Sequence, residues 1–359
     1  FELGANQAVA GEFSARAFDN DKLDLVQAEA IADAIDATSV AAAKSAMRSL
    51  TGEFSQKINA LLEQLIQLRL YVEAAIDFPD EEGVDFLADE HIAKQLRQVC
   101  EQLNNVLATA KQGQLLRDGV SVVIAGRPNA GKSSLLNRLA GQERAIVTDI
   151  AGTTRDILQE TIVLNGLTLN LTDTAGLRQT DDIVEQAGIE RARQAITQAD
   201  LLLMVYDAHR EHEPLRLATE LFGSLPNANS ILMIANKIDL SDNHQNLPKQ
   251  FSSQEQIYHP VYVSCKYGTG LEELVNQICD KVGFHPPENS LIARTRHLDA
   301  LRRTQMALQE ADEQLHLFHA GELVAESLRQ AQLSLNEITG EFTADDLLGK
   351  IFGSFCIGK

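Results

Sequence analysis

The feature that most constrains the fold is a glycine-rich motif at residues 126–133, which reads G-x-x-x-x-G-K-S. It follows a short apolar run at residues 121–125 and precedes a helical pattern at residues 134–139. A strand, a glycine-rich loop and a helix in this order let backbone N–H groups surround phosphate oxygens at the positive end of the helix. The alternative, a chance glycine-rich turn, explains neither flanking element. The motif therefore predicts a phosphate-binding loop.

Two side chains of this loop have distinct expected roles. Lys132 would reach the β- and γ-phosphates of a bound nucleotide, and the Ser133 hydroxyl would take one position around Mg²⁺. The residues of the loop expected to contact the nucleotide are Asn129, Ala130, Gly131, Lys132, Ser133 and Ser134.

Short apolar runs continue after the loop, at residues 161–163, 167–171, 201–206, 231–235 and 261–263. Strands that are buried on both faces of a parallel sheet have this composition. Helical patterns separate most of the runs, so the sequence predicts a doubly wound α/β domain.

A D-x-x-G motif begins at Asp173, just after the run at residues 167–171. A carboxylate there can hold Mg²⁺ through water, and the N–H of Gly176 can contact a γ-phosphate. Ras-like enzymes use a glutamine after this motif to orient the attacking water, whereas this chain has Leu177. Hydrolysis therefore needs another device, or the domain acts as a binding switch. The candidate polar residues downstream are Arg178, Asp181, Asp182 and Glu185.

An N-K-x-D motif, Asn236, Lys237 and Asp239, follows the run at residues 231–235. Its carboxylate can accept hydrogen bonds from guanine N1–H and N2–H₂, and adenine offers no matching pair of donors. The residues expected to close over guanine O6 are Ser264, Cys265 and Lys266. Motifs in this order, each at the carboxyl end of a predicted strand, indicate a site for GTP or GDP.

The α/β region is flanked by helical patterns, from residue 23 to about residue 111 and again from about residue 293. We expect a helix over residues 58–72 that ends near Pro79, and another over residues 89–110 with Gly113 and Gly119 at its exit. Each flank alone has few helices with which to cover its apolar faces. The predicted fold is therefore α/β plus all-α: a Ras-like P-loop GTPase domain inserted into a discontinuous helical domain.

The expected domain boundaries follow from these changes of pattern. Residues 1–18 fit neither block and are interpreted as the remnant of an N-terminal domain. The helical domain would take residues 19–117 and 285–359, and the GTPase domain residues 118–284. The chain begins with Phe1 rather than Met, so we expect further residues to precede it.

The composition restricts the partners and the compartment. A formal net charge of -20 argues against a broad basic face for nucleic acid, because each phosphate contact needs a local cation. The 4 cysteines are far apart, so neither a zinc site nor a disulfide framework is indicated. No apolar run is long enough to span a bilayer. We expect a cytoplasmic protein with no membrane contact.

The motifs together resemble the bacterial tRNA modification GTPases of the MnmE (TrmE) family. The GTPase segments that carry the resemblance are residues 126–134, 152–156, 173–178 and 236–239. The segments outside the GTPase motifs are residues 22–25, 75–82, 296–298, 337–342 and the terminal F-C-I-G-K at residues 355–359. The similarity extends from about residue 11 to residue 359.

The resemblance implies a function beyond nucleotide binding. Family members act with a FAD-dependent partner, MnmG (GidA), to modify C5 of the wobble uridine of certain tRNAs. Their GTPase domains pair across a homodimer in the GTP state. That pairing stabilises a K⁺ ion where an arginine finger would otherwise supply positive charge, which agrees with the need to offset charge in the transition state.

The resemblance also implies roles for individual residues. The K⁺ ligands would be Asn129, Thr148, Ile150 and Thr153. Thr154 would complete the Mg²⁺ shell, and Glu185 would orient the water indirectly in place of the missing glutamine. The nucleotide contacts would include Thr148, Thr153 and Thr154. The catalytic residues would be Lys132, Thr154 and Glu185.

Two differences from the family pattern concern the N-terminus. Family members carry an N-terminal domain that binds formyl-tetrahydrofolate, and nearly all of it lies outside this sequence. Their usual junction, P-G-E-F, reads A-G-E-F at residues 10–13. The resemblance places Cys356 and Lys359 near the folate site as possible participants in the modification, and the alternative for Cys356 is a buried cysteine at a helix end.

Two other functions fit part of the sequence. A ribosome-assembly GTPase shares the GTPase motifs, although such proteins usually carry a basic RNA-binding appendage. A nucleotide-gated scaffold with little hydrolysis would explain Leu177.

Overall fold

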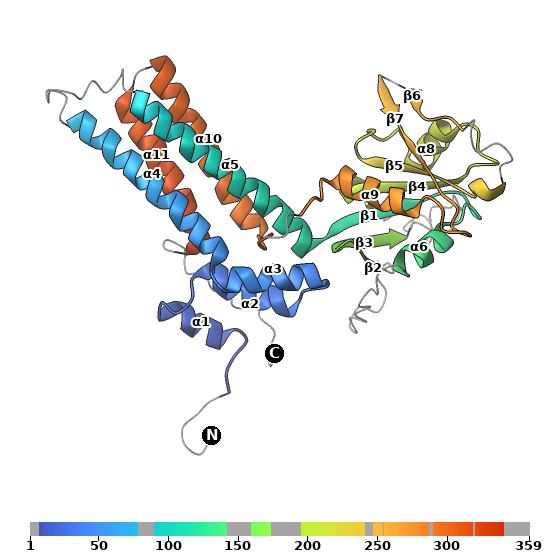
Figure 1. The fold of residues 1–359 in the computed structure, drawn as a ribbon, viewed down its shortest axis with the longest axis horizontal. Helices are drawn as coiled ribbons and strands as arrows, with labels where there is room; N and C mark the ends of the chain where they lie inside the picture. The colour runs from blue at the N-terminus through green and yellow to red at the C-terminus, as the bar shows by residue number, and fades with distance from the viewer. Residues whose placement is uncertain are drawn as a thin grey trace, which may run out of the picture. The chain divides into compact units, whose positions relative to one another are not determined.

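The computed structural model describes residues 7–77, 90–141, 159–173, 195–240, 247–253, 255–286, 290–318 and 320–340. The chain forms two compact units (Figure 1). The helical unit consists of Phe1–Arg117 and Pro286–Lys359, and the α/β unit of Asp118–His285. Since the α/β unit lies between the two parts of the helical unit along the chain, the predicted insertion of one fold into the other is confirmed.

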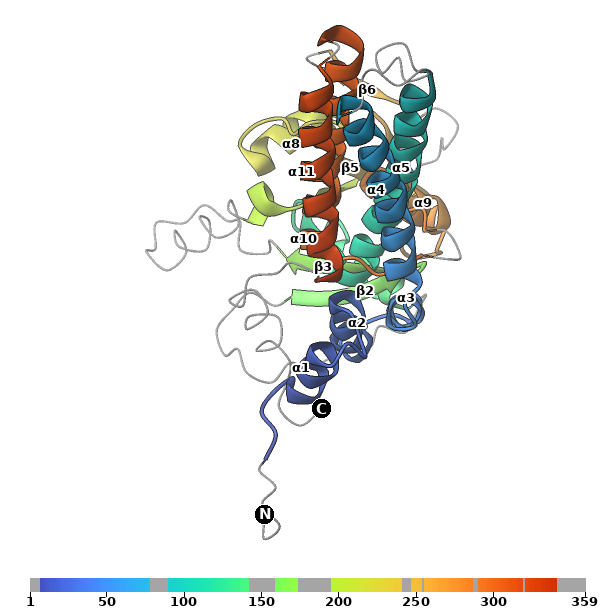
Figure 2. The same cartoon turned by 90° about the vertical axis from the view of Figure 1, so that its left-hand side faces the viewer.

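Four long helices form the main body of the helical unit: α4 (Glu53–Asp77), α5 (Glu90–Asp118), α10 (Thr295–Glu313) and α11 (Gly321–Thr339). They run side by side in both views of the ribbon (Figures 1 and 2). One cluster of buried apolar residues draws on all four, including Leu65, Leu103, Leu308 and Leu328. Two helices come from each side of the insertion, so neither part of the chain can close this core alone.

Helix α5 is longer than the sequence pattern predicts. The expected end of this helix at residue 110 is wrong, because α5 continues to Asp118, which lies between Gly113 and Gly119. A Cβ atom on Gly113 would lie 1.7 Å from the backbone oxygen of Leu291. The glycine therefore lets the segment that returns from the α/β unit lie directly against the helix. A short π-helix, η3 (Gln314–Phe318), follows α10 and was also not expected.

Three shorter helices precede the bundle: α1 (Glu12–Asp19), α2 (Leu25–Ile35) and α3 (Val40–Leu50). A capping box begins α2, since Asp24 Oδ1 accepts from the Gln27 N–H at 2.8 Å and Gln27 Oε1 accepts from the Asp24 N–H at 3.0 Å. Residues 1–18, which the sequence analysis set apart from the helical block, include most of α1. Phe18 of α1 packs against Leu25 of α2.

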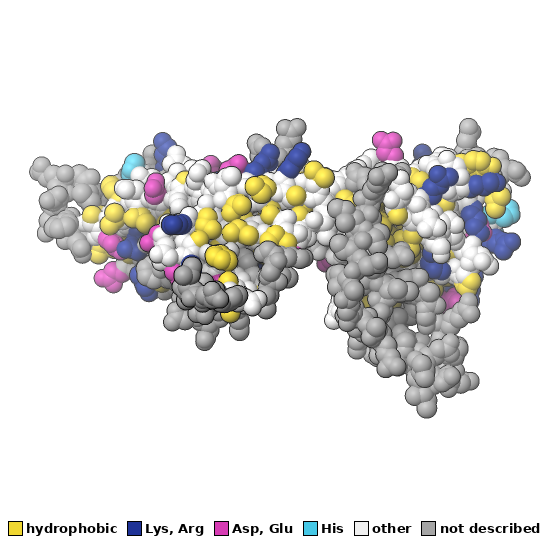
Figure 3. Space-filling model, turned by 90° about the horizontal axis from the view of Figure 1, so that it is seen from below, with side chains coloured by type: hydrophobic (Ala, Val, Ile, Leu, Met, Phe, Trp, Pro, Cys, Tyr) yellow, Lys and Arg dark blue, Asp and Glu magenta, His cyan; other side chains and the backbone are white. Residues whose placement is uncertain are grey.

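Part of the surface of this unit is apolar. Hydrophobic side chains gather on its lower face, where Figure 1 shows α2 and α3 (Figure 3). The exposed large hydrophobic residues of this N-terminal region are Val9, Phe13, Ile35, Val40 and Met47. Among the helices that the structure describes, none is both long enough and apolar enough to cross a membrane.

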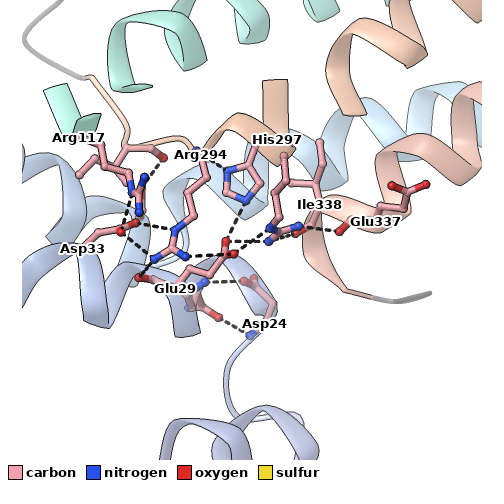
Figure 4. Close-up of polar contacts among 12 residues, drawn as sticks. Asp24, Glu29, Asp33, Arg117, Arg294, His297, Glu337 and Ile338 are labelled. Atoms are coloured by element: carbon pink, nitrogen blue, oxygen red, sulfur yellow. Dashed lines mark hydrogen bonds and ion pairs between the residues drawn. The ribbon is translucent and has the colours of Figure 1, made fainter. Parts of the chain in front are cut away.

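A network of charged side chains, centred on the buried carboxylates of Glu29 and Asp33, joins the two parts of the helical unit (Figure 4). Glu29 of α2 accepts two hydrogen bonds from Arg296, at 2.8 and 2.7 Å, and one from His297 at 3.0 Å. Asp33, one turn later, contacts Arg117 at 2.9 Å and Arg294 at 2.8 Å. Helix α2, in the first part of the helical unit, therefore contacts three residues of the second part: Arg294, Arg296 and His297.

The neutral form of His297 is selected by its two neighbours. Its Nδ1 accepts from the backbone N–H of Arg294 at 3.1 Å, so its Nε2 carries the proton that Glu29 accepts. Burial, helped by the nearby charge of Arg296, lowers the pKa of His297. Burial alone would raise the pKa of Glu29, but the hydrogen bonds from His297 and Arg296 hold that pKa well below its ordinary value.

The α/β unit is built on a six-stranded sheet with the order β2-β3-β1-β4-β5-β8. Its strands are β1 (Val120–Ala125), β2 (Gln159–Leu164), β3 (Leu167–Asp173), β4 (Leu201–Asp207), β5 (Ile231–Asn236) and β8 (Pro260–Tyr262). The six strands expected from the apolar runs are thus all present. All pairs are parallel except that of the edge strand β2 with β3, which form a hairpin.

Helices cover both faces of this sheet. Met204 and Tyr206 of β4 pack on the side of α8 (Pro214–Phe222), with Leu217. The alternate residues Leu203 and Val205 point to the opposite face and are equally buried. The structure also describes α6 (Lys132–Ala140) and α9 (Leu271–Val282) in this unit. A small hairpin, β6 (Phe251–Ser253) with β7 (Gln256–Tyr258), was not expected, because its strands are too short to leave a pattern.

We predict that Glu29→Gln destabilises the helical unit by about 3–5 kcal/mol, because it removes the buried carboxylate that the partly buried Arg296 and the buried His297 contact. Since the chain has no Trp, far-UV circular dichroism during urea unfolding is the suitable measurement. Asp299→Asn is the control, because Asp299 and its partner Arg302 are exposed. Equal midpoints for the two variants would contradict a stabilising role of the network.

The contribution of Glu29 should also depend on pH. The pKa of Glu29 in the folded chain lies below its ordinary value of 4.5. Its stabilisation is therefore complete above that pH and is lost as the pH falls through the lower, folded-state pKa. We expect the difference in stability between the native chain and Glu29→Gln to shrink in acid. A difference that grows as the pH falls below 4 would contradict this sign.

Candidate functional site

The glycine-rich motif forms a tight loop between β1 and α6. Asn129 has a φ of 64° and Gly131, at the N-cap of α6, a φ of 100°, both in the left-handed region. A Cβ atom on Gly131 would lie 2.2 Å from Nδ2 of Asn236. Glycine is therefore required here both by the backbone conformation and by the close approach of a neighbouring side chain.

Lys132, the first residue of α6, turns back over this loop. Its Nζ donates to the backbone oxygen of Gly126 at 2.8 Å and to that of Arg127 at 3.3 Å. The ammonium group is thus held against the loop, where its positive charge favours binding of a phosphate group. Ser133 follows in the first turn of α6 and is exposed, so its hydroxyl is accessible.

The parallel register brings the other motifs to the same edge of the sheet. Ile124 of β1 lies beside Asp173 of β3, and Asp207 of β4 lies beside Asn236 of β5. Asp173 therefore ends its strand next to the start of the phosphate-binding loop. This is the edge at which open α/β sheets bind their ligands.

Asn236 connects three segments of this edge and is 2% exposed. Its Nδ2 donates to the backbone oxygen of Ala130 at 2.9 Å. Its Oδ1 accepts from the N–H of Lys237 at 2.8 Å and from the N–H of Cys265 at 3.2 Å. One buried amide therefore joins the phosphate-binding loop, the end of β5 and the loop at residues 264–266.

Asp239 lies in the 3₁₀ turn η1 (Ile238–Leu240), which follows β5. The hydroxyl of Ser264 donates to its Oδ1 at 2.6 Å. This contact orients the carboxylate and ties it to the loop at residues 264–266. Cys265 is buried, which raises the pKa of its thiol, so the neutral thiol is favoured and the residue is unsuited to act as a nucleophile.

Lys237 is held by a residue that the sequence motifs did not include. Its φ is 67°, and its Nζ contacts Oδ2 of Asp207 at 2.8 Å. Burial would raise the pKa of Asp207, but the hydrogen bond from Lys237 lowers it below the ordinary range. Asp207 directly follows the apolar run at residues 201–206, and that position at a strand end was the available signal.

A second residue missed by sequence reasoning is Arg138 of α6. Its Nε donates to the backbone oxygen of Cys265 at 2.8 Å, and its Nη2 donates to that of Lys266 at 2.7 Å. No sequence spacing could reveal this contact, because the partners are separated by 127 and 128 residues.

Several predicted site residues lie outside the part of the chain that the structure describes. They are Thr148, Ile150, Thr153, Thr154, Gly176, Glu185, Cys356 and Lys359. Their roles stay predictions, as does that of the Asp173 side chain. Within the described ranges, no group of three or more His, Cys, Asp or Glu side chains is arranged to hold a metal ion.

The residues that are described form two connected parts of one site. The loop at residues 126–131 and Lys132 offer N–H groups and a positive charge, which suit phosphates. The carboxylate of Asp239 offers acceptor oxygens and is tied to the loop at residues 264–266 through Ser264, which suits a base that presents hydrogen-bond donors. Such a site selects guanine over adenine.

Comparisons with known proteins found a matching family model and similar chains. A family model described as the MnmE helical domain matches residues 25–356. The tRNA modification GTPase MnmE of Psychrobacter arcticus is 73% identical over all of this chain and 77% of its own length. The Acinetobacter baylyi protein of the same description is 63% identical over all of this chain and 76% of its length. A crystal structure of Era from Aquifex aeolicus is 26% identical, with a TM-score of 0.33, and covers 52% of this chain and 66% of that one.

We predict that Gly131→Ala lowers the affinity for GDP by more than about tenfold, because the added methyl group would displace Asn236 and strain the loop. Titration with a fluorescent GDP analogue measures this. Gly223→Ala is the matched control: Gly223 also has a positive φ, 80°, but no atom lies within 4 Å of the added Cβ. If both variants bind GDP equally well, the close contact with Asn236 is not required for binding.

Proposed function

Because the chain belongs to the MnmE family of tRNA modification GTPases, we propose that it couples GTP hydrolysis to modification of C5 of the wobble uridine of certain tRNAs. The observation that carries this proposal is the joint position of the phosphate-binding loop, Asn236 and Asp239 at one sheet edge. In a chain so similar to tRNA modification GTPases, this edge is the nucleotide site that drives the reaction.

The described residues support specific roles in binding GTP and Mg²⁺. Backbone N–H groups of residues 129–134 and the ammonium of Lys132 would hold the phosphates. The accessible hydroxyl of Ser133 suits Mg²⁺, which prefers oxygen ligands, and Thr154 and Asp173 would complete its shell, the latter through water. When bound, Mg²⁺ would neutralise charge on the phosphates.

K⁺ is proposed as the second cation of the site. Asn129 is exposed in the phosphate-binding loop, and its amide oxygen is a ligand of the type that K⁺ accepts. Thr148, Ile150 and Thr153 would supply the other ligands. Leu177 cannot orient water, so a cation at this place and Glu185 would together replace the usual glutamine and arginine finger.

The proposed partners are a second copy of the chain, a FAD-dependent MnmG (GidA)-type protein and tRNA. The relatives are longer than this chain, which spans 77% of the Psychrobacter arcticus protein. In the full-length family a further domain would bind formyl-tetrahydrofolate, close to the terminal Cys356. We propose that the protein works in the cytoplasm.

One specific observation favours a second candidate. Leu177 in place of glutamine would also fit a nucleotide-gated scaffold that hydrolyses GTP very slowly. The two candidates differ in whether turnover responds to K⁺.

We predict that replacing Na⁺ by K⁺ at constant ionic strength and saturating Mg²⁺ raises GTP turnover by at least about tenfold, because the cation offsets charge in the transition state. Asn129→Ala should abolish this stimulation. Asn165→Ala should retain it, since Asn165 has a comparable φ of 51° but lies in the β2–β3 turn. Equal slow rates in both salts would support the scaffold instead, and repeating the assay with the full-length protein would show whether domain pairing was missing.

We further predict that this chain alone binds tRNA weakly, with little dependence on salt, because its net charge of -20 leaves few cations for phosphate contacts. Filter binding between 50 and 200 mM salt, about the range in which phosphate contacts are lost, measures this. Addition of the flavoprotein partner should tighten binding. Tight, steeply salt-dependent binding by this chain alone would show that it carries its own tRNA surface.

A further inference from the structure

The loop at residues 264–266 is held against α6 by one side chain. Arg138 lies two turns after the phosphate-binding loop and donates hydrogen bonds to two consecutive backbone oxygens, those of Cys265 and Lys266. At 2.8 and 2.7 Å, both are charge-assisted contacts of good length. The planar guanidinium can reach both oxygens at once, which a lysine ammonium on a flexible stem cannot match.

These two contacts fix the direction of the neighbouring N–H groups. In a trans peptide the C=O and N–H point in opposite directions, and the described residues include no cis peptide bond. Because the Cys265 oxygen points to Arg138, the Lys266 N–H points away from it. Because the Lys266 oxygen also points to Arg138, the Tyr267 N–H points away, where it donates to the Ser264 hydroxyl at 3.4 Å.

The N–H groups of this loop then differ in their availability. The Cys265 N–H donates to Asn236, and the Ser264 N–H donates to the backbone oxygen of Thr269 at 3.0 Å. Within the described part of the chain, the Lys266 N–H has no hydrogen-bond acceptor. Arg138 thus orients this donor, among the described residues, in the same loop whose Ser264 hydroxyl orients the Asp239 carboxylate.

We propose that Arg138 is a positioning residue for guanine recognition, which directs the Lys266 N–H toward the O6 atom of the base. Guanine presents an acceptor, O6, next to the donors N1–H and N2–H₂. A fixed N–H beside a carboxylate matches that pattern. The inference rests on the guanine nucleotide site proposed above and deepens it.

The position of Arg138 on α6 gives this contact a further consequence. Helix α6 begins at Lys132, so one helix of 9 residues carries both the phosphate-binding lysine and the arginine that holds the base-binding loop. Asn236 connects the same two regions through Ala130 and Cys265. The distance between phosphate and base contacts is therefore set by a rigid helix on one side and a buried amide on the other.

The test compares three nucleotides that differ only in the base. GDP has the O6 atom and the N2 amino group. In 6-thio-GDP sulfur, a weaker acceptor, replaces O6, and IDP lacks the N2 amino group. The affinity ratio of GDP to 6-thio-GDP reports the contact with O6, and that of GDP to IDP reports the contact with Asp239. Both ratios are measured by calorimetric titration for the native chain, Arg138→Gln, Arg138→Lys and the control Arg216→Gln on α8, whose side chain contacts Glu213 instead.

We expect Arg138→Gln to lower the affinity for GDP by about tenfold and the ratio of GDP to 6-thio-GDP by a similar factor, since one oriented hydrogen bond is lost. The ratio of GDP to IDP should stay within about twofold, because Asp239 keeps its contact with Ser264. For Arg138→Lys, the affinity for GDP and the ratio of GDP to 6-thio-GDP should lie between those of the native chain and of Arg138→Gln. Arg216→Gln should match the native chain.

Three results would overturn the inference. An equal loss of affinity for all three nucleotides would show a merely structural role, and unchanged affinities for all three would show no role. A native chain that binds 6-thio-GDP as tightly as GDP would show that O6 is not read. The midpoint of thermal unfolding of each variant identifies a folding defect. If Arg138→Gln has such a defect, the affinity ratios of Arg138→Lys are compared with those of the native chain instead. Because only binding is measured, the result does not depend on whether GTP hydrolysis or tRNA modification occurs.

Discussion

The structure of the helical unit depends on one constraint: its core must be closed by segments that lie on either side of an inserted domain. Apolar packing among α4, α5, α10 and α11 supplies most of the burial. Such packing tolerates changes of register, because leucine and alanine recur along each helix. The buried carboxylate of Glu29 does not tolerate a change of register, since a buried charge without its partners is strongly unfavourable. We infer that its contacts with Arg296 and His297 select one arrangement of the two segments.

The same network also holds the two chain connections to the α/β unit. Arg117 is the last residue of the first segment of the helical unit, and Arg294 follows soon after the chain returns at Pro286. Both contact the carboxylate of Asp33, at 2.9 and 2.8 Å. Gly113 lets the returning segment approach α5 closely. The points at which the chain leaves and re-enters the helical unit are thus fixed by a single side chain of α2.

The nucleotide site follows a similar principle, in which a few polar side chains join segments that are distant in sequence. Asn236 contacts both the phosphate-binding loop and the loop at residues 264–266, and Arg138 of α6 contacts the second loop as well. The sequence motifs identified Asn236, Lys237 and Asp239 as residues that touch the ligand. The structure adds that Asn236 first serves to bring the loops together. This agrees with the membership of the chain in the MnmE family of tRNA modification GTPases.

The sequence by itself determined the class of fold and predicted the motifs that the structure brings to one edge of the sheet. Apolar runs of strand length, a glycine-rich loop and short motifs at strand ends are local patterns, so they can be read without knowledge of what they contact. Only the tertiary structure decided the rest. Arg138 meets the backbone of Cys265 across 127 positions, Glu29 meets His297 across 268, and Gly113 sits inside a helix because Leu291 passes beside it. These contacts leave no periodic signal, because they depend on which surfaces the folded chain brings together.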